Sequence, residues 1–531
     1  MKVSDMIINC LEAEGVEYVF GIVGTEMLEL AHSLSKSNQI QYVNVRHEQG
    51  AAFMADVYGR LAMKPGVCLS TLGPGATNLL TGIASAKLDH SPVIALIGQA
   101  DVKRNHPESH QYLDLMKLCE PATKWSTQIM DSLTVPTVMR KAFRVAQMEK
   151  PGSVAIVVPE NFLTQKITNK PLPIYPLPET APVKETIQAA RTLIQNRMKP
   201  FIIIGNGVVR QDAHAELQTF INTVQAPVTH SFMAKGVLEK EHPSNYFTFG
   251  FKENDEVLLG IEEADLLITI GFDFVEQLPK DWNKRKIPVL HIDASPAEIN
   301  EYYPVEIECV GNIKRTLQAL NQAELTKKPW VPFGNLKEKI TNAYQINSSQ
   351  PETNNQSFTI EEILHCIESV SSENTNVLSD VGAHKVSIAR TYQPKQLNRL
   401  IISNGLATMG IAIPGSIGAK LACPDDPVIC ITGDGGALMN FAEIETAKRL
   451  GLSFVIIILN DSMLKLEAQQ MIKLFGESNG VTFQNPDFIQ LAASFGIKGV
   501  QARNIVEFET TIKEALKNAN EIVLIEALLE T

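Results

Sequence analysis

The chain has 531 residues, of which 44% are hydrophobic and 20% are charged, and its formal net charge is −12. This length exceeds what one hydrophobic core accommodates, so we expect three domains of ordinary size. The acidic balance and the scattered lysines and arginines argue against nucleic-acid binding, which depends on clustered cations. An anionic substrate would therefore need a local cation or a metal ion.

Residues 1–20 lack the apolar run of a signal peptide, and their apolar positions (Met6, Ile7, Cys10 and Leu11) recur at helical spacing. The seven cysteines are scattered and make no Cys-x-x-Cys pair, which is typical of reduced thiols. No apolar run reaches the length of a membrane span. We therefore expect a cytoplasmic protein without a membrane segment.

Strand-like runs alternate with amphipathic helical stretches along most of the chain, which predicts an α/β fold of doubly wound parallel-sheet domains. The pattern breaks at the proline-rich segment 170–183, and again at 327–335 and at the polar segment 347–356. The three predicted domains are, in chain order, 1–170, 183–325 and 357–531.

One strand–glycine–helix theme occurs in each predicted domain. It reads "VCLSTLGPGATNLL" in the first, "FIIIGNGVVR" in the second and "VICITGDGGALMNF" in the third. In the third copy we expect the strand to end at Gly433 and a helix to run from about 437 to 450. Ligands of open parallel sheets bind at this edge, beside helix N-termini that favour phosphate.

Two oxygen donors are expected at the same edge of the third sheet. Asp434 follows one strand, and Asn460 and Asp461 follow the next strand, "SFVIIIL". Mg²⁺ prefers one or two protein carboxylates together with substrate phosphates. An isolated Gly-Asp-Gly is more often an ordinary loop, but the paired arrangement favours a metal site.

Gly-Asp-Gly followed about two dozen residues later by an Asn-Asp pair resembles the motif of thiamine-diphosphate enzymes. The resemblance implies three doubly wound domains of that type. It also implies that Asp434, Asp461 and the backbone carbonyl of Met463 hold Mg²⁺, and that the metal holds the diphosphate of the cofactor.

The resemblance also requires a glutamate in the first domain, and "NVRHEQGAAFMADVYGR" supplies Glu48. A carboxylate bonded to the aminopyrimidine favours the tautomer that acts as the internal base. In "ISNGLATMGIAIPG", Met409 is implied to impose the bent shape of the cofactor, and the carbonyl of Ala407 to accept from its amino group. Gln111 is implied to orient the substrate. Taken singly, each is more often a structural residue.

Further cofactor contacts are implied by glycine-rich loops in the first and third domains. They are Val23, Gly24, Pro74, Asn78, Gly382, Ala383, His384, Gly433, Gly435 and Gly436. In such enzymes the two halves of one site come from different subunits. The resemblance therefore implies a homodimer or homotetramer with active sites at the subunit interface.

Nearly the whole chain resembles the acetolactate synthases, and "GFDFVEQLPKDWN" is similar to their catabolic, flavin-free branch. FAD is therefore not expected. The implied reaction decarboxylates one pyruvate, a 2-oxo acid, and joins the remaining two-carbon unit to a second pyruvate, which gives 2-acetolactate.

Two acids leave alternatives open. Glu26 stands near a position where the catabolic enzymes carry a lysine, and Glu467 stands where simple 2-oxo acid decarboxylases have a catalytic glutamate. A decarboxylase that releases an aldehyde is therefore one alternative, with Glu467 as its proton donor. A non-catalytic thiamine-diphosphate-binding paralogue is the other, and the presence of Glu48, Met409 and Asp434 argues against it.

Overall fold

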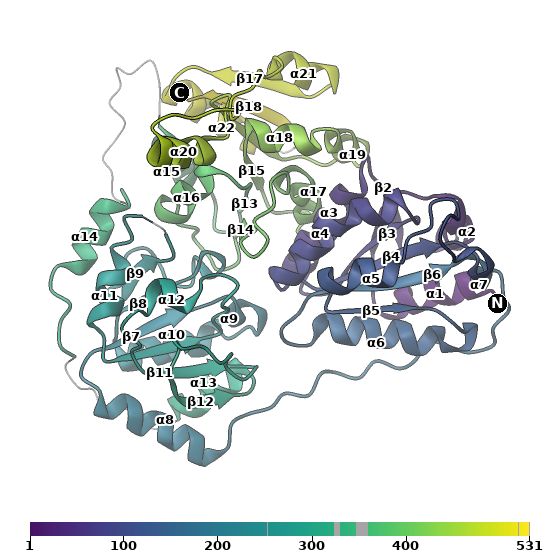
Figure 1. Cartoon of the computed structure of the whole chain (residues 1–531). Coiled ribbons are helices and arrows are strands. Elements are labelled where there is room, and N and C mark those ends of the chain that lie inside the picture. The colour runs from purple at the N-terminus through teal and green to yellow at the C-terminus, as the bar shows by residue number, and fades with distance from the viewer. Residues whose placement is uncertain (252, 323–329, 347–358, 519, 530–531) are drawn as a thin grey trace.

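The computed structural model describes residues 1–251, 253–322, 330–346, 359–518 and 520–529. It contains three sheets, each of six parallel strands with helices on its faces, which confirms the predicted fold class (Figure 1). The segments 1–170, 183–325 and 357–531 remain our proposal for the domain limits, and the predicted break at 347–356 lies outside the described residues.

The first sheet has the strand order β2-β1-β3-β4-β6-β5, and the chain crosses over between its parallel strands through helices. Its strands are, in that order, β2 (Gln41–Asn44), β1 (Tyr18–Gly21), β3 (Gly66–Ser70), β4 (Val93–Gln99), β6 (Ser153–Pro159) and β5 (Trp125–Gln128). Its helices are α1 (Val3–Ala13), α2 (Leu28–Leu34), α3 (Glu48–Ala62), α4 (Pro74–Leu88), α5 (Leu115–Cys119), α6 (Val135–Gln147) and α7 (Glu160–Leu163).

The second sheet follows a long connection that Figure 1 shows running from the first domain to α8. Its strands are, in spatial order, β12 (Val305–Val310), β11 (Val289–Asp293), β10 (Leu266–Ile270), β7 (Pro200–Ile204), β8 (Val228–His230) and β9 (Asn245–Thr248). Its helices are α8 (Lys184–Asn196), α9 (Gly207–Arg210), α10 (His214–Val224), α11 (Val257–Glu263), α12 (Pro279–Trp282), α13 (Ile313–Asn321) and α14 (Leu336–Ala343).

The third sheet carries the Gly-Asp-Gly motif. Its strands are, in spatial order, β14 (Leu400–Ile402), β13 (Asn376–Ser379), β15 (Val428–Gly433), β16 (Val455–Asn460), β18 (Val523–Leu528) and β17 (Lys498–Ala502). Its helices are α15 (Ile360–Val370), α16 (Ala383–Thr391), α17 (Ala412–Ala422), α18 (Asp434–Asn440), α19 (Glu443–Arg449), α20 (Lys465–Phe475), α21 (Phe488–Ser494) and α22 (Ile505–Lys517).

The single helix predicted over 437–450 is wrong, because two helices, α18 and α19, occupy this region. Helix α18 begins three residues earlier than expected, since Asp434 accepts a hydrogen bond from the backbone N–H of Gly435 and suits the positive end of the helix. At its other end the side chain of Asn440 donates to the carbonyl of Gly410 at 2.8 Å. The break therefore coincides with a contact to the loop that carries Met409.

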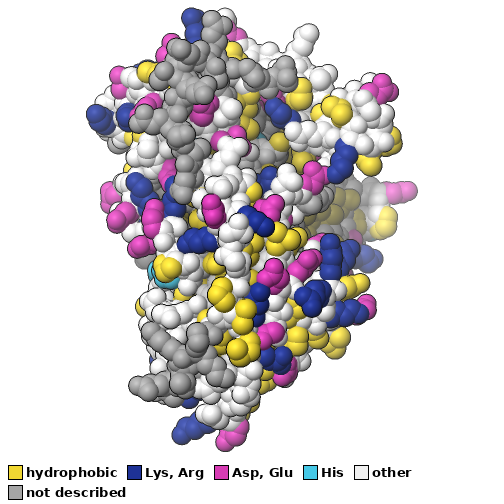
Figure 2. Space-filling view, turned by 90° about the vertical axis from the view of Figure 1, so that its left-hand side faces the viewer, with side chains coloured by type: hydrophobic (Ala, Val, Ile, Leu, Met, Phe, Trp, Pro, Cys, Tyr) yellow, Lys and Arg dark blue, Asp and Glu magenta, His cyan; other side chains and the backbone are white. Residues whose placement is uncertain are grey.

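One hydrophobic core joins the first and third domains, because α3 and α17 pack together between their sheets (Figure 1). All seven cysteines are free, as the sequence predicts. Positive and negative side chains are interspersed over the face in Figure 2. Within the described part of the chain, no helix is both long and apolar enough to span a membrane.

Candidate active site

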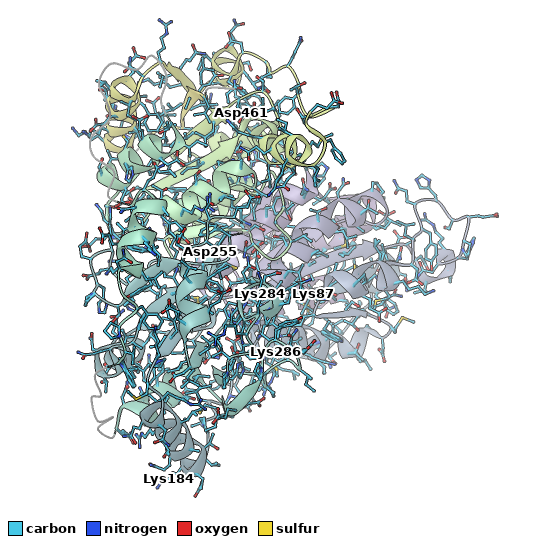
Figure 3. The ribbon with its side chains drawn as sticks, turned by 60° about the vertical axis from the view of Figure 1, so that its left-hand side comes forward. Lys87, Lys184, Asp255, Lys284, Lys286 and Asp461 are labelled. Carbon is cyan, nitrogen blue, oxygen red and sulfur yellow. The ribbon has the colours of Figure 1, made fainter. Side chains whose placement is uncertain are left out.

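A pocket opens at the carboxyl ends of β15 and β16, where the sequence predicts the metal site. The two strands are parallel neighbours, with Gly433 in register with Leu459, so the residues that follow them meet at one edge. Figure 3 labels Asp461 in this third domain. The pocket is lined by eleven of the predicted site residues: Gly382, Ala383, His384, Met409, Gly433, Asp434, Gly435, Gly436, Asp461, Met463 and Glu467.

The carboxylates of Asp434 and Asp461 are both suited to a cation. Burial, and then the negative charge of Asp434, raise the pKa of Asp461, so a bound cation would relieve the repulsion. Lys465 lies 3.5 Å from Oδ2 of Asp461. Among the described residues no group of three or more His, Cys, Asp and Glu side chains is placed to hold a metal ion. A site with two carboxylates and a backbone carbonyl suits Mg²⁺, which keeps ligand phosphates in its remaining positions.

Asn485 fixes the orientation of Asp434, and the sequence analysis missed it. Its side-chain N–H donates to Oδ2 of Asp434 at 2.7 Å and to Oδ1 of Asn460 at 2.9 Å. The backbone N–H of Ser462 donates to the same Asp434 oxygen at 2.7 Å. Asn485 precedes a proline in a connecting segment, where asparagine usually marks a turn, so no local signal distinguishes it.

His384 lies in the first turn of α16 and is a candidate donor to a diphosphate. Its Nε2 atom is buried and has no hydrogen-bond partner among the described residues. Burial lowers the pKa of His384 to about 4, so the imidazole is neutral at pH 7. An orphaned ring nitrogen beside a helix N-terminus fits the anionic end of the predicted cofactor.

Asp380 holds the loop that carries Met409, and it too was missed. Its Oδ1 accepts from the backbone N–H groups of Val381 at 2.7 Å and Gly410 at 2.8 Å, and its Oδ2 accepts from Thr432 at 3.0 Å. Burial raises the pKa of Asp380 to about 6. The loop and the end of β13 are therefore tied together directly behind the pocket.

A second cluster lies in the first domain, around Glu48. Glu48 is the first residue of α3 and is 7% exposed, and the side chain of Asn78 on α4 donates to its Oε2 at 2.9 Å. Pro74 begins α4, and the turn before it passes close to Gln111. Glu48, Pro74, Asn78 and Gln111 are thus brought together near the end of β3.

The segment with Val23 and Gly24 borders the same cluster. Gly24 packs against Thr71, and the hydroxyl of Thr71 donates to Oε2 of Glu26 at 2.7 Å. Glu26 is 9% exposed, so this acid is a hydrogen-bonded part of the first domain and is not a freely solvated charge.

Among the described residues, all those that line the pocket lie between 360 and 529, so the Glu48 cluster of the same chain is not part of this lining. Ala407 is exposed and lies outside the pocket lining. Left-handed backbone occurs in both clusters and at this loop, at Gln111 (φ 57°), Ala407 (φ 53°) and Ser462 (φ 56°). This conformation costs free energy in a non-glycine residue, and it also occurs at other loops of the chain.

The glycine loop of the second domain has a structural explanation. The backbone N–H of Gly207 donates to the carbonyl of Gly271 at 2.9 Å, and a Cβ at Gly207 would lie 2.7 Å from the Cα of Gly271. Two loops at the ends of neighbouring strands therefore pack backbone to backbone, and this close approach is sufficient to explain the glycine.

Three family models match the chain and follow the three sheets. The N-terminal TPP binding domain of thiamine pyrophosphate enzymes matches residues 1–118, the central domain matches 187–320, and the C-terminal TPP binding domain matches 380–527. With the fold and the pocket, these matches define the chain as a thiamine pyrophosphate enzyme.

Curated relatives match over almost the full length. An acetolactate synthase of Bacillus subtilis is 30% identical over 98% of this chain and 92% of its own length. A probable acetolactate synthase large subunit of Methanocaldococcus jannaschii is 33% identical over 100% of this chain and 92% of its own. The acetolactate synthase isozyme 3 large subunit of Escherichia coli is 28% identical over 99% and 94%. The chain belongs to the acetolactate synthase family.

Proposed function

We propose that this protein is an acetolactate synthase, which joins two molecules of pyruvate to 2-acetolactate with loss of one CO₂. One observation carries the proposal: Asp434 and Asp461 line a single pocket in a chain whose full-length relatives are named acetolactate synthases. Glu48 is a buried acid of the N-terminal domain, and its presence argues against a non-catalytic paralogue.

The metal and cofactor would be held mainly by the third domain. Asp434, Asp461 and the carbonyl of Met463 would bind Mg²⁺, and the metal would bind the diphosphate together with the glycine loops and His384. When bound, thiamine diphosphate supplies a nucleophilic carbon that adds to the ketone of pyruvate, and a cationic thiazolium ring that takes up the electron pair of the bond broken in decarboxylation. Met409 lines the pocket and would impose the bent shape of the cofactor.

Glu48 would accept a hydrogen bond from, or share a proton with, the pyrimidine of the cofactor. Its Oε2 is already engaged by Asn78, and among the described residues its Oε1 accepts no hydrogen bond, so this oxygen would be available to the cofactor. The carboxylate would then stabilise the tautomer that removes the reactive proton. Gln111, on the same side, would orient a pyruvate.

We further infer that each active site is completed by a second copy of the chain, in a homodimer or homotetramer. The pocket of the third domain contains no residue of the Glu48 cluster of the same chain, so a partner would supply it. Mixing and reassembling two inactive variants, Glu48→Gln and Asp434→Ala, tests this. Shared sites should restore up to about a quarter of the parent activity, because half of the dimers are hybrid and each has one intact site. No restoration would place both residues in one chain's site.

We propose that the enzyme is cytoplasmic and that it does not need FAD. The free cysteines agree with a reducing compartment. In the second domain the Gly207 loop is accounted for by its packing against Gly271, without a dinucleotide. A flavin absorption band in the purified protein would contradict this proposal.

A simple decarboxylase is the second candidate, because Glu467 is exposed on α20 and lines the pocket. The ratio of CO₂ released to pyruvate consumed separates the two reactions. A synthase releases one CO₂ for every two pyruvates, whereas a decarboxylase releases one CO₂ for each pyruvate. The names of the full-length relatives favour the synthase.

A further inference from the structure

A buried carboxylate of the third domain holds the backbone that leads into Glu48. Glu443, the first residue of α19, is 1% exposed. Its Oε1 accepts hydrogen bonds from the backbone N–H groups of Arg46 and His47, both at 3.0 Å, and its Oε2 accepts from the hydroxyl of Thr446 at 2.7 Å. Helix α3 begins at the next residue, Glu48.

The contact is built into both domains. Figure 1 shows α19 beside the start of α3 and the end of β2. A Cβ at position 50 would lie 2.6 Å from Oε1 of Glu443, so only Gly50 lets the carboxylate approach the helix. Next to it, the side chain of Asn440 donates to Oε1 of Gln49 at 3.3 Å. A carboxylate at this place also complements the positive end of α3.

Packing against α4 and α17 fixes the body of α3, and Glu443 adds a hydrogen-bonded anchor to the two residues before its first turn. Within its own segment, the ring of His47 accepts from the N–H of Gln49 and caps the helix, but it gives no link to the rest of the protein. The side chain of Glu48 itself is held by Asn78 at one oxygen. A shift of the first turn of α3 would therefore move the carboxylate of Glu48.

We propose that Glu443 is a positioning residue for Glu48: it sets the place of the first turn of α3 and thereby aims the Glu48 carboxylate at the cofactor. This proposal rests on the proposed role of Glu48. A displacement of about 1 Å at a reacting group can lower the rate about a hundredfold, so loss of this contact should have a measurable effect on kcat.

The test uses three variants of the full-length holoenzyme. Glu443→Ala removes the acceptor, Glu443→Gln keeps an acceptor oxygen for the two N–H groups, and Glu445→Ala is the matched control. Glu445 lies on the same helix and also contacts Arg46, but it pairs with the side chain of Arg46, at 3.4 Å. The side chain of Glu445 is 40% exposed. The readouts are hydrogen–deuterium exchange of the segment 44–52, and kcat and KM for pyruvate.

We expect Glu443→Ala to speed the exchange of the Arg46 and His47 amides at least about tenfold. It should lower kcat by about 10- to 100-fold while KM for pyruvate stays within about twofold. Glu443→Gln should recover most of both properties, and Glu445→Ala should match the parent. Unchanged exchange and kcat in a folded Glu443→Ala would overturn the proposal.

If Glu443→Ala does not fold, Thr446→Val gives the decision. This change removes the hydroxyl that orients Oε2 of Glu443 and leaves the acceptor Oε1 in place. We expect faster amide exchange and a lower kcat. Parent values for both would refute the proposal. A different result tests the proposed role of Glu48 itself: a Glu48→Gln variant with parent activity would show that Glu48 has no part in the reaction. An inactive Glu48→Gln beside a fully active Glu443→Ala would refute only the positioning.

Discussion

Asn78 donates a hydrogen bond of 2.9 Å to Oε2 of Glu48, and this contact joins the N-terminal parts of two neighbouring helices, α4 and α3. The amide can bond either a carboxylate or a carboxamide at position 48, since it carries both a donor and an acceptor. A change of Glu48 to glutamine is therefore tolerated by the local structure and isolates the chemistry of the acid.

Glu48→Gln should lower kcat by at least about a hundredfold, because the carboxylate that tunes the pyrimidine is lost. The affinity for thiamine diphosphate in the presence of Mg²⁺ should stay within a few-fold, because the diphosphate is held by the third domain. Steady-state kinetics and titration calorimetry measure the two quantities. Parent-like kcat would remove Glu48 from the mechanism.

Asp434→Ala should abolish the Mg²⁺-dependent part of thiamine-diphosphate binding, because one of the two proposed carboxylate ligands disappears. Calorimetric titrations with and without Mg²⁺ test this. Asp487→Ala is a suitable control, since Asp487 is an acid of the same domain that caps α21 and lies outside the pocket lining. Equal Mg²⁺ dependence in the Asp434→Ala variant and the control would refute the metal site.

Asn485→Ala should weaken Mg²⁺ binding by about 10- to 100-fold, because Asp434 loses the hydrogen bond that orients it. The thermal midpoint of the protein without metal separates this effect from a general loss of stability. A variant with parent Mg²⁺ affinity would show that the backbone N–H groups of Gly435 and Ser462 are enough to orient the carboxylate.

Lys235 predicts a pH dependence of stability. It is 2% exposed and donates to Thr248 at 3.0 Å and to the carbonyl of Ala389 at 2.6 Å, and burial lowers the pKa of its ammonium from 10.5 to about 7. Between these two pH values the unfolded chain holds the proton and the folded protein does not. The free energy of unfolding contributed by Lys235 therefore rises with pH in this window, and below about pH 7 its destabilising effect is complete.

Lys235→Met removes the titrating group and keeps an unbranched side chain. Relative to the parent, the variant should gain more stability at about pH 6.5 than at about pH 9, by roughly 2–3 kcal/mol. Urea unfolding of both proteins at the two pH values measures this difference. A constant difference would mean that Lys235 stays charged throughout.

The fold and the pocket of the third domain could be predicted because their signals are local. Alternating strand and helix patterns define the parallel sheets, and parallel neighbours such as β15 and β16 bring Asp434 and Asp461 to one edge. Glu443, Asn485 and Asp380 could not be found in this way. Their partners lie far away in the sequence, as the contact between Glu443 and His47 illustrates, and each is an ordinary residue of its own helix or loop.

The prediction of one helix over 437–450 failed for a related reason. The apolar periodicity continues through α18 and α19, so it gives no sign of the break. The break accompanies the contact from Asn440 to Gly410, in a loop some thirty residues earlier, which the sequence pattern does not encode.

The most direct test of the account is the product formed from ¹³C-labelled pyruvate by the purified enzyme with Mg²⁺ and thiamine diphosphate, without FAD. Nuclear magnetic resonance resolves acetolactate from acetaldehyde. We predict acetolactate as the main product, with one CO₂ released for two pyruvates consumed. Acetaldehyde, with one CO₂ for each pyruvate, would contradict the account and would make Glu467 the proton donor of a decarboxylase.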